Sequence, residues 1–282
     1  MARIEDQAAL AAEPGDLAPD PARRLDVVFR LGAGAFSLLL LLIAWEAFAR
    51  SGKVTPFMLP PFSAVVERIY DDAVTGDLWR NLGLTIYRAM TGFCIATIGG
   101  VALGAAMSRS RLVHWFFDPI ISVGFPMPKI AFLPIIMLWL GLFDVAKISI
   151  VVFDAIFPVV TATLAGIAGV EKELVWSARN MGAKERELMW QIVLPAALPQ
   201  ILTGLQVALP ISLIVAIIGE MAMGGYGLGG AMMTASRFAD SRGVFAGIVE
   251  IAIVGYILIK AMALIRRRLL VWHQEVSELT KA

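Results

Sequence analysis

The residues of this chain that could do chemistry are few, and the most suggestive of them form a glycine pattern. Residues 225–230 read Gly-Tyr-Gly-Leu-Gly-Gly, which satisfies the G-x-G-x-x-G fingerprint of dinucleotide binding. That fingerprint requires a preceding strand and a following helix within a βαβ unit, whereas here an apolar stretch of membrane-helix length comes first. We therefore interpret the run as a flexible turn and not as a nucleotide site.

Catalytic and metal-binding constellations are missing from the sequence. It has a single cysteine, Cys94, and two histidines, His114 and His273, that lie far apart and lack ligand spacing. It has no G-x-x-x-x-G-K-[ST] phosphate loop and no nucleophile elbow. The sequence therefore predicts a chain that is not an enzyme and binds no cofactor itself. The net charge of +1, without a long basic tract, gives no reason to expect a nucleic-acid partner.

Two ionisable residues in apolar stretches are candidates for a transport path. Lys129 lies in one such stretch, flanked by Pro126 and Pro128. A lysine at membrane depth is costly unless it faces a cavity or a partner. It therefore either attracts an anion in transit or pairs with a buried acid such as Asp154 or Glu220. Glu220 ends another apolar stretch and is the second candidate, as a gate or as a cap beside the glycine run.

The elements that must position these residues are membrane-spanning helices. Hydrophobic residues make up 59% of the chain and charged residues 17%, against about 45–50% and about 25% in soluble domains. An apolar stretch of about 20 residues crosses a bilayer as a helix. We expect an all-α integral membrane protein whose six spans cover residues 31–49, 81–107, 118–140, 145–167, 198–221 and 244–265. Arg88 and Lys260, within these spans, are interpreted as snorkelling or ion-paired groups.

The N-terminal region admits two interpretations. Residues 47–49, Ala-Phe-Ala, match the small-x-small pattern that signal peptidase cuts, and cleavage would leave five spans. A signal peptide starts with a short basic region, whereas a long acidic segment precedes this span, so we favour an uncleaved first span. Residues 1–24 have too little apolar content to fold alone and are expected to form a disordered tail. Residues 63–75, after the span, are either a short surface helix or a plain connector.

The distribution of basic residues predicts the orientation. Lys and Arg accumulate on the cytoplasmic side of a membrane protein, and most of those outside the spans fall in the proposed inside segments, including the run Arg266-Arg267-Arg268. Both termini are therefore expected in the cytoplasm. The proposed outside segments hold only Arg50, Lys53, Arg68, Arg80, Arg237 and Arg242.

Residues 171–195 are too charged to cross the membrane and too apolar to remain uncovered in water. Leu174, Ala178 and Met181 recur at helical spacing, which predicts a helix with these residues on one face. Gly182 then ends that helix, because glycine adopts the left-handed conformation without steric cost. A second short helix over residues 184–193 is expected to end where prolines lead into the next span, and another protein to dock on the pair.

This segment resembles the cytoplasmic loop of the permease subunits of ABC importers. Their pattern is Glu-Ala-Ala, three residues, Gly, nine residues, Ile-x-Leu-Pro. Here Gly182 is followed by nine residues and then by Ile-Val-Leu-Pro at 192–195, with Ala178 as the third small residue of the pattern. Trp176 and Ser177 depart from its Glu and first Ala. The resemblance implies a coupling helix seated in a groove of a separate ATPase subunit, with coupling residues Ala178, Gly182, Ile192, Leu194 and Pro195.

Further stretches resemble the nitrate/sulfonate/taurine family of these permeases. They are residues 126–141, residues 219–230 and the Leu-Pro-Pro of residues 59–61. The resemblance implies a type I ABC importer permease over residues 25–282, in the plasma membrane, acting as a homodimer with two ATPase subunits that bind ATP and Mg²⁺. A periplasmic or lipid-anchored substrate-binding protein completes the complex. The implied cargo is a small anion such as nitrate, a sulfonate or taurine, bicarbonate, or an aromatic acid.

Two other classes of protein compete with this interpretation. An ion-driven transporter or channel has no ATPase partner, so co-purification distinguishes it. A membrane-embedded enzyme requires catalytic residues that the sequence does not show. The substrate itself stays open, because a separate binding protein largely selects it in this family.

Overall fold

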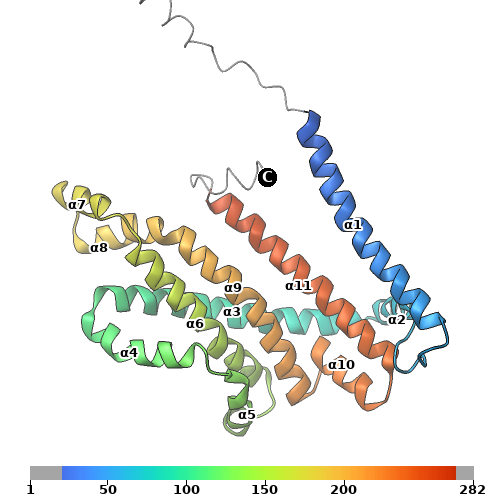
Figure 1. Cartoon of the computed structure of the whole chain (residues 1–282). Coiled ribbons are helices and arrows are strands. Elements are labelled where there is room, and N and C mark those ends of the chain that lie inside the picture. The colour runs from blue at the N-terminus through green and yellow to red at the C-terminus, as the bar shows by residue number, and fades with distance from the viewer. Residues whose placement is uncertain (1–20, 271–282) are drawn as a thin grey trace, which may run out of the picture. The chain divides into compact units, whose positions relative to one another are not determined.

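The computed structural model describes the backbone of residues 21–270 and the side chains from Phe36 onward. Most of the predicted tail, residues 1–24, therefore lies outside the described residues. Contacts divide the chain into two units, residues 1–63 and residues 64–282. Every regular element in the described range is a helix, as expected from the composition (Figure 1).

The first unit is built on α1 (Pro21–Arg50), which contains the first predicted span. Its 30 residues correspond to about 45 Å of helix, more than the roughly 30 Å of a hydrocarbon core. The connection after α1 folds back on its end, where Trp45 Nε1 donates a hydrogen bond of 3.0 Å to the carbonyl of Pro60. The Trp45 ring also packs on Phe62, with ring centroids 5.4 Å apart.

Between residues 62 and 270 the structure describes twelve elements. In chain order they are α2 (Phe62–Thr75), α3 (Asp77–Arg109), α4 (Arg111–Gly124), the 3₁₀ helix η1 (Lys129–Phe132), α5 (Leu133–Leu140), α6 (Asp144–Ala168), α7 (Lys172–Asn180), α8 (Glu185–Glu187), the π-helix η2 (Leu188–Val193), α9 (Leu194–Met223), α10 (Leu228–Arg237) and α11 (Ser241–Leu269). The helical alternative for residues 63–75 is therefore correct, since α2 covers them.

Four helices among the described residues are long and apolar enough to cross a membrane. They are α3, α6, the continuous helix Glu185–Met223 and α11. These match the second, fourth, fifth and sixth predicted spans. A further crossing is reached only if α4, η1 and α5 are taken together as one bent span.

The third predicted span, residues 118–140, is interrupted, as expected from Pro126 and Pro128, which break a helix. The chain bends by 98° between α4 and the η1–α5 helix. Pro126 and Pro128 lie at the break, where proline removes backbone donors and clashes with the preceding helical turn. Non-helical backbone at membrane depth requires a protein environment or a water-filled path around it.

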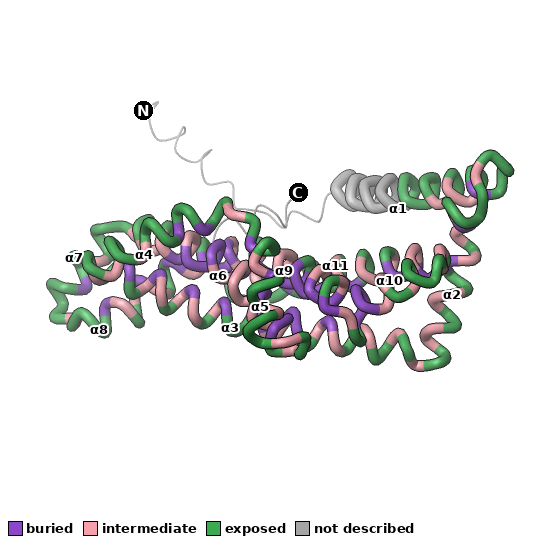
Figure 2. Tube along the Cα trace, turned by 90° about the horizontal axis from the view of Figure 1, so that it is seen from below, coloured by how far each residue is buried: buried purple, intermediate pink, exposed green. Residues whose placement is uncertain are grey.

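The core forms where α6 packs against α3 and α9, and Figure 2 shows buried positions gathered along these helices. Small residues allow the close approach of α3 to α6. A Cβ on Gly100 would lie 2.8 Å from the Val159 side chain, and one on Gly104 would lie 2.7 Å from Thr163. The small-xxx-small pattern of residues 100–104 is therefore used for packing inside this chain.

Candidate functional site

The segment that resembles a coupling loop lies at one end of α6 and α9 (Figure 1). Its first helix, α7, ends at Asn180, and Gly182 follows with a φ of +88°, which confirms the predicted left-handed turn. The Ala183 N–H donates to the Ala178 carbonyl at 3.1 Å, and the Gly182 N–H donates to the Arg179 carbonyl at 3.0 Å. This pair of bonds is the Schellman motif, which satisfies carbonyls that the helix end would leave unpaired.

The second helix of the segment does not end at the prolines, contrary to the prediction. After α8, the chain forms the π-helix η2 and continues directly into α9 as one helix, Glu185–Met223. The Leu194 N–H donates to the carbonyl of Met189, five residues earlier. Pro195 is in the first turn of α9, where a missing N–H is tolerated. The π turn lies directly before it, as such turns do where a helix must absorb a local irregularity.

A small core of its own holds this segment together. Ala178, Leu188 and Val193 are buried against one another, and Ile192 packs on them half-buried. Ala178 is only 2% exposed, which explains the small residue at this position of the pattern. Leu194 is half-buried, whereas Gly182 and Pro195 are exposed.

Large apolar side chains of the segment remain uncovered in the single chain. Met181 is 80% exposed, Trp176 58% and Leu174 47%. The predicted single face is therefore divided, because Ala178 points into the small core while Leu174 and Met181 face outward. Exposed apolar groups beside charged ones are typical of a protein interface.

Lys129 is paired within the chain. It is 7% exposed, and its Nζ lies 3.1 Å from Oδ1 of Asp154. The ammonium also donates to the Phe125 carbonyl at 2.8 Å and lies 4.7 Å from the ring centroid of Phe157. Of the two alternatives for Lys129, the geometry corresponds to the structural pairing, with Asp154 as the acid and not Glu220.

Glu220 is fully buried, at 0% exposure, and its partner is Arg88. The Arg88 Nη1 lies 2.6 Å from Glu220 Oε1, while the Thr85 hydroxyl donates to Oε2 at 2.8 Å. The Gly229 N–H, in the first turn of α10, donates to the same Oε2 at 3.1 Å. The Glu220 carboxylate therefore caps α10, and Arg88 of α3 balances its charge. Of the two roles expected for Glu220, gate or cap, this geometry corresponds to the cap.

The residues around this pair were not recognised as a group from the sequence. Arg88 also binds Asp144 at 2.7 Å, and Lys147 Nζ donates to the Gly224 carbonyl at 2.7 Å. The one available signal was that charged residues of opposite sign recur in the apolar stretches. The same network corrects the interpretation of residues 225–230 as a flexible turn: the last three begin α10, and a Cβ on Gly229 would lie 2.3 Å from the Ile217 carbonyl.

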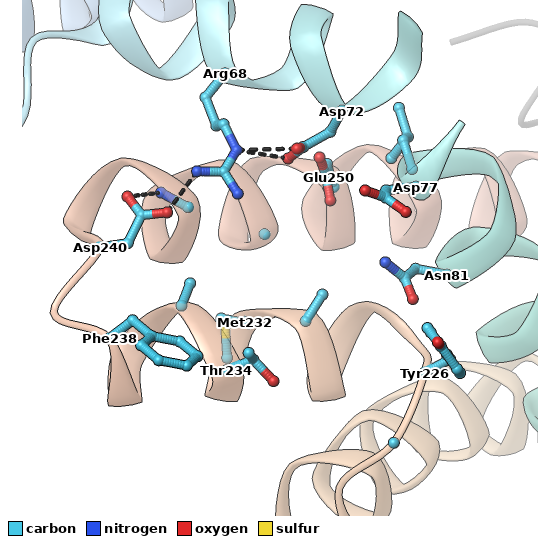
Figure 3. Close-up of a pocket in the computed structure, with 16 residues that line it drawn as sticks. Arg68, Asp72, Asp77, Asn81, Tyr226, Met232, Thr234, Phe238, Asp240 and Glu250 are labelled. Atoms are coloured by element: carbon cyan, nitrogen blue, oxygen red, sulfur yellow. Dashed lines mark hydrogen bonds and ion pairs between the residues drawn. The ribbon is translucent and has the colours of Figure 1, made fainter. Parts of the chain in front are cut away.

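A cavity of about 480 Å³ with several charged lining residues lies at the other end of α9, between α2, α3, α10 and the start of α11 (Figure 3). We call it the α10 pocket; its charged lining residues are Arg68, Asp72, Asp77, Asp240 and Glu250. Arg68 binds Asp72 at 2.9 Å and also pairs with Asp240. Partial burial would raise the pKa of Asp240, but the Gly243 N–H and Arg68 hold it below its usual value.

The helical membrane domain carries a charged, glycine-terminated segment at one end of its spans, at the place where the sequence predicts the coupling segment of an ATP-driven import permease. The comparisons with known proteins agree. The family model described as "Binding-protein-dependent transport system inner membrane component" matches residues 96–271, and the chain belongs to this family. It is a multi-pass inner-membrane permease subunit of an ABC importer and not an enzyme.

Two bacterial relatives carry names that refer to sulfonates. The chain is 32% identical over 246 residues to the taurine transport system permease protein TauC of Escherichia coli, covering 86% of this chain and 90% of the relative. It is 31% identical to the putative aliphatic sulfonates transport permease protein SsuC of Bacillus subtilis, covering 83% and 85%. These relatives place the chain with the nitrate/sulfonate/taurine permeases.

Solved structures support the fold. The chain is similar to the MetNI methionine ABC transporter, with a TM-score of 0.57 and 18% identity over 70% of this chain and 95% of the other. An amino acid ABC transporter gives a TM-score of 0.59 at 19% identity, covering 70% and 95%. The type I importer permease fold follows from these matches.

Proposed function

We propose that this chain forms half of the translocation path of an importer for taurine or aliphatic sulfonates. The relatives named for these compounds cover more than four fifths of the chain, which supports this choice among the small anions. In the proposed complex the chain is a homodimer that binds two ATPase subunits, which hold ATP and Mg²⁺, and an external substrate-binding protein delivers the cargo.

The observation that carries the coupling mechanism is the structure of residues 171–195. The Schellman turn at Gly182 and the small core around Ala178 fix α7 against the start of the Glu185–Met223 helix. A force on α7 is therefore transmitted to a membrane helix without an intervening flexible linker. Closure of the ATPase pair on ATP moves α7, and the bundle alternates between outward and inward access.

The exposed side chains of α7 supply the contact with the ATPase. Leu174, Trp176 and Met181 project from a short helix whose other face is closed by its own core. Trp176, which replaces the Glu of the family pattern, makes an apolar contact in place of a polar one. Large aromatic side chains often contribute most of the binding energy at an interface.

Replacement of Gly182 by valine tests this coupling. A β-branched residue at a φ of +88° is strained, by about 1–2 kcal/mol or more. No atom lies within 4 Å of a Cβ built at this position, so the effect comes from the backbone conformation and not from a clash. We expect the variant to reach the membrane but to retain less ATPase subunit on co-purification, and to transport more slowly.

The matched control is Gly182→Asn, because asparagine tolerates the left-handed conformation better than other non-glycine residues. It should retain most of the ATPase subunit. Equal retention by the valine variant would show that the turn does not position α7. A wild-type chain that binds no ATPase subunit would instead favour an ion-driven transporter.

The substrate is tested in proteoliposomes that contain the permease, the ATPase and the binding protein. We expect ATP-dependent uptake of taurine or an alkanesulfonate, measured with isotope-labelled compounds, in preference to nitrate and bicarbonate. Uptake of nitrate alone would contradict the sulfonate proposal and leave the permease assignment intact.

A further inference from the structure

The α10 pocket lies at the end of the helix bundle opposite the coupling segment. α9 runs from Leu194, beside the coupling segment, to Met223, beside the pocket, and its 30 residues correspond to about 45 Å. Figure 1 shows α7 and α10 at opposite ends of α9. If α7 meets an ATPase in the cytoplasm, the pocket opens on the external face.

The charges that project into the pocket are not balanced within it. Arg68 is already engaged by Asp72 and Asp240, and no other cationic side chain lines the cavity. Asp77 and Glu250 have no ion-pair partner among the described residues. Figure 3 shows both directed into the same cavity as Asp72. The pocket therefore presents an excess of negative charge.

Glu250 gives a separate indication that an occupant is missing. Its Oε1 is buried and has no hydrogen-bond partner in the described part of the chain. A buried carboxylate oxygen without a partner costs free energy that native structures seldom leave uncompensated. A donor that enters from outside would remove this cost.

The lining favours a side chain of a protein over a metal ion. No group of three acidic, histidine or cysteine residues among those described is arranged to hold a metal. Phe238, at the pocket, is 81% exposed, and Tyr226 is 54% exposed, with the Arg80 guanidinium 3.5 Å from its ring centroid. Exposed aromatic residues around a partly buried charge are typical of protein interfaces, where they exclude water from a charged contact.

We propose that the α10 pocket receives a lysine or arginine side chain of the substrate-binding protein, with Asp77 and Glu250 as its acceptors and the two aromatic residues as the rim. This inference rests on the proposed function, because it needs an external partner protein. A basic side chain carries several N–H donors at the end of a long flexible stem, so it can enter the pocket and donate to a carboxylate there.

The test measures the affinity of the substrate-binding protein that supports transport by this chain for the permease–ATPase complex in lipid nanodiscs. We expect Asp77→Asn/Glu250→Gln to weaken binding by about tenfold or more and to reduce its dependence on salt. The matched control is Glu67→Gln/Asp71→Asn, which removes the same two charges from exposed positions of α2 outside the pocket. It should bind as the wild type does.

The outcomes separate this proposal from the proposed function. Equal affinity and equal salt dependence of the pocket variant would overturn the pocket proposal, while ATPase co-purification with the wild type would still support the permease function. Free taurine carries an ammonium group and could itself enter the pocket. If the wild type binds free taurine and the pocket variant does not, the pocket is a site for a small ammonium compound, and the proposal of a protein side chain is overturned. If the double variant folds poorly, the single variant Asp77→Lys takes its place, because Asp77 is exposed and its replacement should disturb folding little.

A charge reversal then tests the contact directly. Binding that Asp77→Lys weakens and that a lysine-to-glutamate variant of the binding protein restores would support the contact.

Discussion

Glu220 and Arg88 form an ion pair that is buried within the helix bundle. Arg88 is 4% exposed and Glu220 is 0% exposed. Removal of one member of a buried ion pair lowers the free energy of unfolding strongly, because the remaining charge stays buried without that partner. The pair connects α3 to α9, and through the Gly229 N–H also to α10.

Replacement of Glu220 by alanine is therefore expected to lower the free energy of unfolding by about 3–5 kcal/mol. The cost arises because Arg88 keeps only Asp144, which is half exposed, as its acidic partner. Unfolding by detergent titration measures this change. Glu67→Ala, at an exposed position of α2, is the control and should change the free energy by about 0.5 kcal/mol or less.

For Lys129 we expect a structural effect that a second substitution relieves. Lys129→Met leaves Asp154, whose side chain is 18% exposed, without its cation, and should reduce thermal stability. Lys129→Met/Asp154→Asn removes both charges and should recover most of the loss and transport at nearly the wild-type rate. A stable double variant that fails to transport would show that the lysine meets the anion in the path.

Single residues could be singled out from the sequence, but their partners could not. Charge at membrane depth identified Lys129 and Glu220, because such residues are costly unless they are paired or face a cavity. The choice of Asp154 for Lys129, and of Arg88 for Glu220, depends on how four helices, η1, α6, α3 and α9, pack. That packing is a long-range property with no local signature.

At the scale of the elements, the contact between α3 and α6 is set by glycine. Gly100→Leu would drive a side chain into Val159 and the carbonyl of Ile156, which lie 2.8 Å and 3.3 Å from the Cβ position. We expect a strong loss of folded protein, measured as the monodisperse yield after detergent extraction. Gly83→Leu on the same helix is the matched control, because no atom lies within 4 Å of its Cβ position, and its yield should be close to that of the wild type.

The lengths of the apolar stretches predicted which membrane helices form. They did not predict where a helix bends or where two helices join into one. Four of the predicted spans coincide with long helices, since about 20 apolar residues suffice to indicate each one. The break at residues 125–128 could be expected from Pro126 and Pro128, but its bend of 98° could not. Proline within a membrane helix is compatible with continuity or with a break, as Pro158 and Pro210 show by lying inside unbroken helices.

At the scale of the whole permease unit, residues 64–282, two functional surfaces lie at opposite ends of one helix. The coupling segment adjoins the start of α9 and the α10 pocket adjoins its end. If the chain crosses the membrane as the basic residues indicate, the first surface is cytoplasmic and the second external.

Cysteine labelling tests this orientation in a background with Cys94→Ser, since Cys94 is exposed. Met181→Cys and Phe238→Cys place a thiol on positions that are 80% and 81% exposed. In intact spheroplasts, a membrane-impermeant maleimide should label position 238 only, and inside-out vesicles should reverse the result. Labelling of both positions from one side would contradict the topology.

The π-helix η2 affects the orientation of the coupling helix α7 relative to the membrane helix α9. A π turn is equivalent to one residue inserted into an α-helix, and one residue corresponds to about 100° of rotation about the axis. η2 lies between α7 and the membrane part of α9, so it sets the angular phase of one relative to the other. Deletion of a single residue from Leu188–Val193 would restore a regular helix and turn Trp176 by about 100°, with the hydrophobicity of the span unchanged. The length of this turn, as much as its composition, decides which way the coupling helix faces.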